Sequence, residues 1–146
     1  KDGIARDGMG ENHAPANWLS HEWSPQIKEN VKKSLNLLSN GIESVRSEGV
    51  KLAISAVPHK PQFEDQQSTR PIETLRTFAN QRAVSFIPTY QALRDRYSLD
   101  EIGKLYWPSD ATHFNIEGNK VWAEIQLDTL RDRRNGLLPA CAMTSR

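Results

Sequence analysis

The stretch "VKLAISAVP", residues Val50–Pro58, decides the fold class of this 146-residue chain. It is short, nearly apolar and rich in β-branched residues, which is typical of a strand buried on both faces of a parallel sheet. A second stretch of the same kind, "AVSFIP", covers Ala83–Pro88. The two stretches are separated by a helical pattern. They therefore predict a parallel pair of strands, because parallel neighbours need a crossover between them.

Helical patterns lie on either side of the first strand. One helix is expected to begin with Ser24 as its N-cap and Pro25 in its first turn, and to end at Gly49. Its apolar residues recur at spacings of three and four and form one buried stripe: Ile27, Val31, Leu35, Leu38, Ile42 and Val45. A second helix is predicted over "RPIETLRTFANQR", with four residues facing inward: Ile72, Leu75, Phe78 and Ala79.

The chain after the second strand continues the alternation. Residues 89–106 predict two short helical turns, residues 107–115 a loop, and residues 116–133 a final helix. The whole pattern indicates an α/β fold with a short parallel sheet flanked by helices. We expect residues 1–25 to be irregular, with Trp18 and Trp23 packed onto the body, residues 26–134 to form the α/β domain, and residues 135–146 to form a tail.

Composition excludes several classes of function. The net charge is +1, from 19 basic and 18 acidic residues that are well mixed, so nucleic acid is not an expected partner. No apolar run is long enough to span a membrane. Cys141 is the single cysteine, the histidines lack metal-ligand spacing, and no glycine-rich phosphate loop is present. We therefore expect neither a metal nor a cofactor.

Polar residues follow both predicted strands, at the edge where α/β sheets bind ligands. His59 and Lys60 come directly after the first strand, in "PHKP". This stretch is also an ordinary polar loop between two prolines, which is the interpretation we favour for it.

The stretch "WPSDATHFN" carries an aspartate and a histidine three residues apart, Asp110 and His113. A carboxylate that accepts from histidine Nδ1–H fixes the tautomer and leaves Nε2 free to take a proton from a hydroxyl. Asn115 is expected to cap the final helix, and Gly118 to permit the close approach of another backbone. The alternative is structural, with Asp110 a turn residue and His113 partly buried and hydrogen-bonded.

The block "PSDATHFNIEGNKVWAEI" resembles the last conserved block of the SGNH (GDSL-type) hydrolases. The resemblance covers about residues 50–130 and implies the C-terminal half of a flavodoxin-like, three-layer sandwich. It implies that His113 is the general base of a Ser–His–Asp triad and that Asp110 orients it. "GENH" is similar to a second block of that family, which would make Asn12 an oxyanion donor, although a surface loop is the competing interpretation.

The family's nucleophile motif, a G-D-S-type sequence after the first strand, is not found in this chain. The sequence therefore predicts an esterase or acyl-transfer lineage whose attacking serine comes from residues outside it. The expected substrate is an ester or acyl-bearing small molecule or glycan. The alternative is a non-catalytic α/β binding or assembly module. In either case the exposed edge of a half-sheet favours a homo-oligomer, most simply a dimer.

Overall fold

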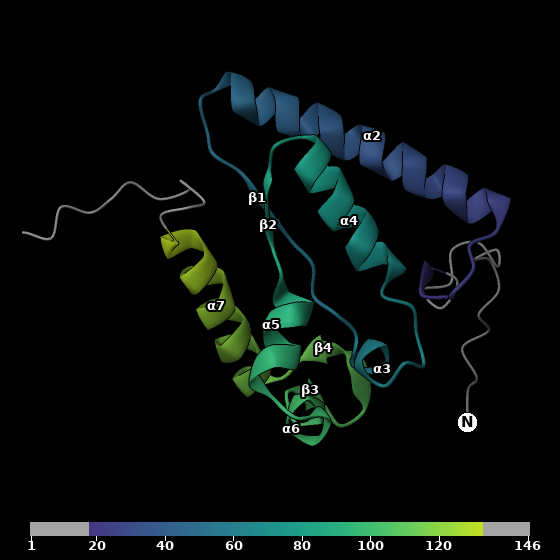
Figure 1. Ribbon diagram of the computed structural model, residues 1–146, viewed down its shortest axis with the longest axis vertical. Coiled ribbons are helices and arrows are strands. Elements are labelled where there is room, and N and C mark those ends of the chain that lie inside the picture. The colour runs from purple at the N-terminus through teal and green to yellow at the C-terminus, as the bar shows by residue number, and fades with distance from the viewer. Residues whose placement is uncertain (1–17, 133–146) are drawn as a thin grey trace, which may run out of the picture.

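The computed structural model describes residues 18–132 (Figure 1). Its strands form one parallel and one antiparallel pair, and helices alternate with them along the chain. The predicted α/β character is therefore confirmed in its general form. The elements are α2 (Pro25–Ser47), β1 (Ala53–Ser55), α3 (Lys60–Phe63), α4 (Arg70–Gln81), β2 (Ser85–Ile87), α5 (Thr89–Arg96), α6 (Leu99–Gly103), β3 (Tyr106–Trp107), β4 (Asp110–Phe114) and α7 (Ile116–Arg131).

The parallel pair lies between two layers of helices. β1 pairs with β2 in a register that sets Ile54 opposite Phe86, and both side chains pack against the α2–α4 side. Ala53 and Ile87, which alternate with them, pack on the opposite side together with residues of α7. Figure 1 shows α2 and α4 on one side of the strands and α7 on the other. Because successive side chains of a strand point to opposite faces, each strand contacts both the α2–α4 layer and the α7 layer.

The predicted first helix is confirmed in its start, its buried face and its end. The Ser24 hydroxyl accepts from the Ile27 amide at 3.2 Å, so it caps the first turn. The chain leaves the helix at Gly49, whose φ of +72° suits a residue without a Cβ. Along the predicted stripe, Ile27, Val31 and Ile42 are buried and the other three residues are half-buried.

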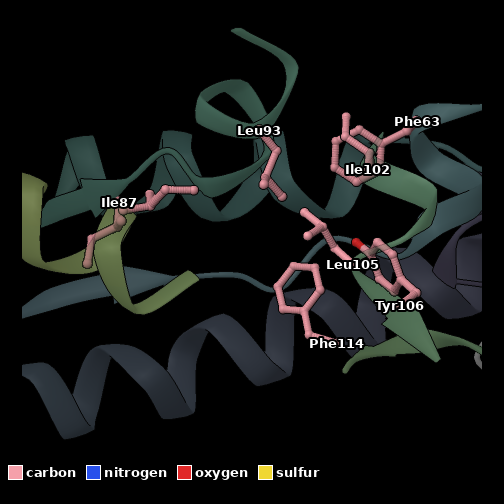
Figure 2. Close-up of a cluster of buried hydrophobic side chains, with 8 residues drawn as sticks. Phe63, Ile87, Leu93, Ile102, Leu105, Tyr106 and Phe114 are labelled. Carbon is pink, nitrogen blue, oxygen red and sulfur yellow. The ribbon is translucent and has the colours of Figure 1, made fainter. Parts of the chain in front are cut away.

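The apolar side chains on the other side of the strands form a separate cluster, which we call the hairpin core (Figure 2). Tyr106 and Phe114 lie side by side in it, with ring centroids 4.8 Å apart and planes tilted by 48°. The cluster joins α3, β2, α5, α6, the β3–β4 hairpin and α7 through eight buried residues: Phe63, Ile87, Leu93, Ile102, Leu105, Tyr106, Phe114 and Ile125.

Two local predictions were wrong. Residues 107–115 are not a loop, because β3 and β4 form an antiparallel hairpin in which Tyr106 pairs with Phe114 and Trp107 with Asp110. The polar stretch after β1 is not wholly irregular either, because it contains α3. Phe63 anchors that short helix in the hairpin core with 2% of its surface exposed.

The predicted strands are also shorter and less buried than expected. Each is only three residues long, and the three residues of β1 are half-buried. Val50 and Val57, at either end of the first stretch, are 52% and 40% exposed. With only one neighbour in the described part of the chain, β1 cannot be enclosed as a central strand would be.

The start of α7 is held against the hairpin, as the sequence predicts. The Asn115 Oδ1 atom accepts from the Gly118 amide at 3.0 Å and caps the helix, while its Nδ2 donates to the carbonyls of Lys104 and Tyr106 at 2.7 and 3.1 Å. Gly118 lies against the Leu105 carbonyl and the Phe114 side chain, where a Cβ would have no room. Both residues therefore have the structural roles predicted for them.

Among residues 18–132, no helix is long and apolar enough to cross a membrane.

Candidate active site

Asp110 lies at the tip of the hairpin, where one of its two carboxylate oxygens holds the turn. Oδ1 accepts from the Thr112 amide at 2.8 Å, from the Thr112 hydroxyl at 2.5 Å and from the His113 amide at 3.3 Å. An aspartate that bonds to the backbone two residues further on is a common turn device. Oδ1 thus fixes the backbone that carries the histidine.

The second carboxylate oxygen is directed at the histidine ring. Asp110 Oδ2 and His113 Nδ1 are 2.6 Å apart, and the Thr112 hydroxyl lies 2.9 Å from the same nitrogen. An ionised carboxylate can only accept, so Nδ1 carries the proton and Nε2 presents a lone pair. The His113 side chain is 76% exposed. The arrangement therefore provides an oriented imidazole whose basic nitrogen is accessible.

Hydrogen bonds keep the Asp110 carboxylate ionised. The Thr112 hydroxyl contributes most to lowering the pKa of Asp110 well below its usual range, followed by the Thr112 amide and by His113. Each donor stabilises the charged form and leaves the protonated form without an equal interaction. His113 therefore faces a fixed negative charge throughout the neutral pH range.

This pKa difference predicts how the turn responds to acid. Because the folded-state pKa of Asp110 lies below the unfolded value of about 3.9, its contribution to stability is complete above that pH. It is lost as the pH falls below 4 through the folded-state pKa. We expect Asp110→Asn to lower the free energy of unfolding by a constant amount above about pH 5, and the gap from wild type to shrink below pH 4. Urea unfolding at several pH values measures this gap, and a gap that does not change with pH would contradict it.

A buried tyrosine fixes the hairpin to the end of the first strand. The Tyr106 hydroxyl donates to the Pro58 carbonyl at 2.6 Å, and both residues are buried. Burial raises the pKa of Tyr106 far above its ordinary value, so the hydroxyl keeps its proton and remains a donor. The bond joins residues 48 positions apart in the chain. It brings the hairpin that carries Asp110 and His113 to the carboxyl end of β1, the edge where α/β sheets bind ligands.

The same contact brings a second histidine to the pair. His59 follows Pro58 directly, and burial is the main cause that lowers its pKa. The charges of His113 and Asp110 also act on His59, the first lowering its pKa and the second raising it. His59 therefore lies close enough to the pair for the charges of both residues to act on it.

Among residues 18–132, no attacking hydroxyl and no oxyanion donor is seen bonded to the His113 ring. Asn12 lies outside the described residues. Ser55, at the end of β1, bonds to Thr89 at 3.2 Å and to Gln126 at 2.7 Å instead. Within residues 18–132, the His113 ring bonds to the Asp110 carboxylate and the Thr112 hydroxyl, and to no serine hydroxyl. No group of three potential metal-ligating side chains occurs in that range either.

An apolar hollow in the described part of the chain lies away from the pair. It has a volume of about 160 Å³, lies between α2 and α4, and is lined in part by Trp18, Trp23 and Leu75. Both tryptophans are half-buried and line this hollow together with residues of α2 and α4, so they pack onto the body as predicted, and the Trp23 indole donates to the Trp18 carbonyl at 2.9 Å. His113 instead stands on an exposed surface of the hairpin.

Two members of the site were missed or undervalued from the sequence. Thr112 bonds to both Asp110 and His113, and its position directly before the histidine was the available signal. His59 was noticed at the correct strand end, but sequence spacing alone could not show that it lies near residue 113.

The geometry on its own supports an oriented acid–base pair and no more specific identity. In comparisons with known proteins, no protein-family model, no curated protein and no solved structure matches this chain.

Proposed function

We propose that this chain supplies the acid–base part of an SGNH-type ester hydrolase or acyltransferase site, with His113 as the general base. The observation that carries the proposal is the 2.6 Å contact between Asp110 Oδ2 and His113 Nδ1 at the carboxyl edge of a parallel strand. It is supported by the resemblance of the closing block to that family. The assignment of the domain to the SGNH three-layer sandwich is part of the same proposal.

In the proposed reaction, His113 takes up and returns a proton in each of two steps. As an attacking hydroxyl oxygen bonds to the acyl carbon, its proton passes to Nε2 and the carbonyl electron pair moves onto the acyl oxygen. Asp110, kept ionised by Thr112, stabilises the imidazolium that forms. When the electron pair on the acyl oxygen re-forms the carbonyl, the acyl carbon–oxygen bond to the leaving group breaks and Nε2 returns the proton to the leaving oxygen, so the acyl group stays on the attacking oxygen. Water or an acceptor hydroxyl then attacks the acyl carbon in the same way, and its proton passes through Nε2 to the first attacking oxygen as that oxygen leaves. His113 and Asp110 end the cycle unchanged.

The attacking group in the complete site is proposed to be a serine hydroxyl from outside this chain. The exposure of His113 is consistent with a site that a further segment or a second copy of the chain would cover. Where only water can attack, turnover should be weak, because no covalent intermediate divides the reaction into two easier steps. The proposed substrate is an ester or acyl-bearing small molecule or glycan, and a homo-oligomer remains the proposed assembly.

Hydrolysis of p-nitrophenyl acetate by the full chain tests this proposal. We expect a slow steady release of nitrophenol that exceeds the release by an equal concentration of free imidazole. We expect no initial burst and no labelling by a fluorophosphonate probe, because the serine is not in place. Release no faster than with imidazole would overturn the general-base assignment. A labelled serine would overturn the proposed origin of the nucleophile.

One observation favours the alternative of a non-catalytic module. Three of the four bonds made by the Asp110 carboxylate serve the turn itself, so a structural role alone would account for them. That role does not require an exposed imidazole. Hydrolysis that is independent of His113 would decide in favour of the module.

A further inference from the structure

The Nδ1 atom of His59 is buried and makes no hydrogen bond of ordinary geometry in the described part of the chain, although the His59 side chain faces the backbone amide of Gln62 at the start of α3. Buried polar side-chain atoms nearly always have a partner, so an unpaired one calls for an explanation. His59 as a whole is only half-buried, and Nε2 is not among the covered, unpaired atoms. The two ring nitrogens therefore have different surroundings.

The backbone around His59 is held firmly at this position. Its amide donates to the Gln62 Oε1 atom at 2.8 Å, and the buried Gln62 side chain in turn donates to the Ser68 carbonyl at 2.6 Å. On its other side, the Pro58 carbonyl accepts from Tyr106. The residue is thus fixed between α3 and the hairpin.

The position of the single proton on His59 follows from these surroundings. Burial and the neighbouring His113 both disfavour the charged ring, so His59 is neutral and carries one N–H. Placing that proton on Nδ1 would bury an unpaired donor, which costs free energy. Placing it on Nε2 lets the proton reach solvent or a ligand. The neutral Nε2–H form is therefore the expected tautomer.

We propose that His59 is a second functional residue of the site, whose Nε2–H donates a hydrogen bond to the acyl oxygen of the substrate. This inference rests on the proposed function. His59 would then donate to the oxygen on which negative charge develops. The resemblance of "GENH" to a family block implied this role for Asn12. The substrate class it implies is one with a carbonyl oxygen between the two histidines.

In the proposed reaction, Asp110, His113 and His59 differ in charge, and each charge suits a different role. Asp110 stays negative, His113 alternates between neutral and positive, and His59 stays neutral, so it remains a donor without competing for the proton that His113 takes. A fixed donor at a developing oxyanion lowers the barrier because it needs no reorganisation during the reaction.

Two substitutions of His59 in the full chain test the inference in the p-nitrophenyl acetate assay. His59→Leu removes the donor while keeping an apolar volume, and we expect kcat to fall on the order of 10²-fold with KM little changed. His59→Gln can place an amide N–H near the position of Nε2, and we expect it to keep kcat within about tenfold of wild type. Equal losses in both variants would indicate a structural role and overturn the inference.

The tautomer gives a second, independent measurement. Two-bond proton–nitrogen NMR correlations on the wild-type chain should show His59 neutral, with its proton on Nε2, at pH 7. A proton on Nδ1 would overturn the inference whatever the kinetics. If His113→Ala leaves hydrolysis unchanged, the proposed function fails. If His113→Ala abolishes it and His59→Leu does not reduce it, only the role of His59 fails.

Discussion

Replacing Gly118 by alanine is expected to destabilise the fold by about 3 kcal/mol or more, although alanine is the better helix former. A Cβ at this position would overlap the Leu105 carbonyl oxygen and lie 2.9 Å from the Phe114 Cβ atom. Neither neighbour can give way easily, since one is backbone and the other is buried in the hairpin core. Urea-induced unfolding of the full chain measures the loss.

Gly41 provides a matched control for this prediction. It also lies inside a helix, but a Cβ there would meet nothing within 4 Å. Gly41→Ala should therefore show only the helix-propensity gain, a stabilisation of up to about 1 kcal/mol. If Gly118→Ala stabilised the fold as Gly41→Ala does, close packing would not explain why residue 118 is a glycine.

The contrast between the two glycines shows what sequence could and could not predict about the fold. The period of the apolar residues predicted α2, α4 and α7, and the β-branched runs predicted the parallel pair. Capping signals were also informative, because the Ser24 and Asn115 caps depend on residues only three positions away. These are local relations, so one sequence contains them.

The hairpin and α3 depend on contacts that are distant in the chain. The Tyr106–Phe114 pair is stabilised by the hairpin core, whose members range from Phe63 to Ile125. The polar residues at the hairpin tip give no alternating pattern to distinguish a short strand from a loop. α3 has one buried apolar residue, Phe63, within a polar stretch, so its periodicity could not be recognised.

The candidate site divides in the same way. Asp110 and His113 are three residues apart, and their contact could be predicted from spacing and from the chemistry of the pair. Their proximity to His59 requires the bond between Tyr106 and Pro58, which no sequence pattern records. A local motif thus predicted the base and its orienting carboxylate, whereas the surrounding groups emerged only from the tertiary structure.

Replacing His113 by alanine is expected to reduce the hydrolysis of p-nitrophenyl acetate by about 10²- to 10⁴-fold, or to the uncatalysed background if wild-type turnover is weak. The substitution removes the proton acceptor, and alanine offers no other group to take its place. Because the side chain is 76% exposed, stability should change little apart from the loss of its bond to Asp110. Initial rates at a fixed protein concentration, with unfolding curves for both proteins, separate the two effects.

The control must account for the reaction of p-nitrophenyl acetate with any accessible imidazole. His21→Ala removes an exposed histidine outside the candidate site and should leave the rate within about twofold of wild type. Asp110→Asn, which keeps the imidazole but removes its fixed charge, should fall between wild type and His113→Ala. The decisive result is the order of the rates of the His21, Asp110 and His113 variants. If His113 reacted only as an accessible surface imidazole, without help from the carboxylate, His21→Ala and His113→Ala would lower the rate equally. Equal losses would reduce Asp110 to a turn residue and leave the chain as a binding or assembly module.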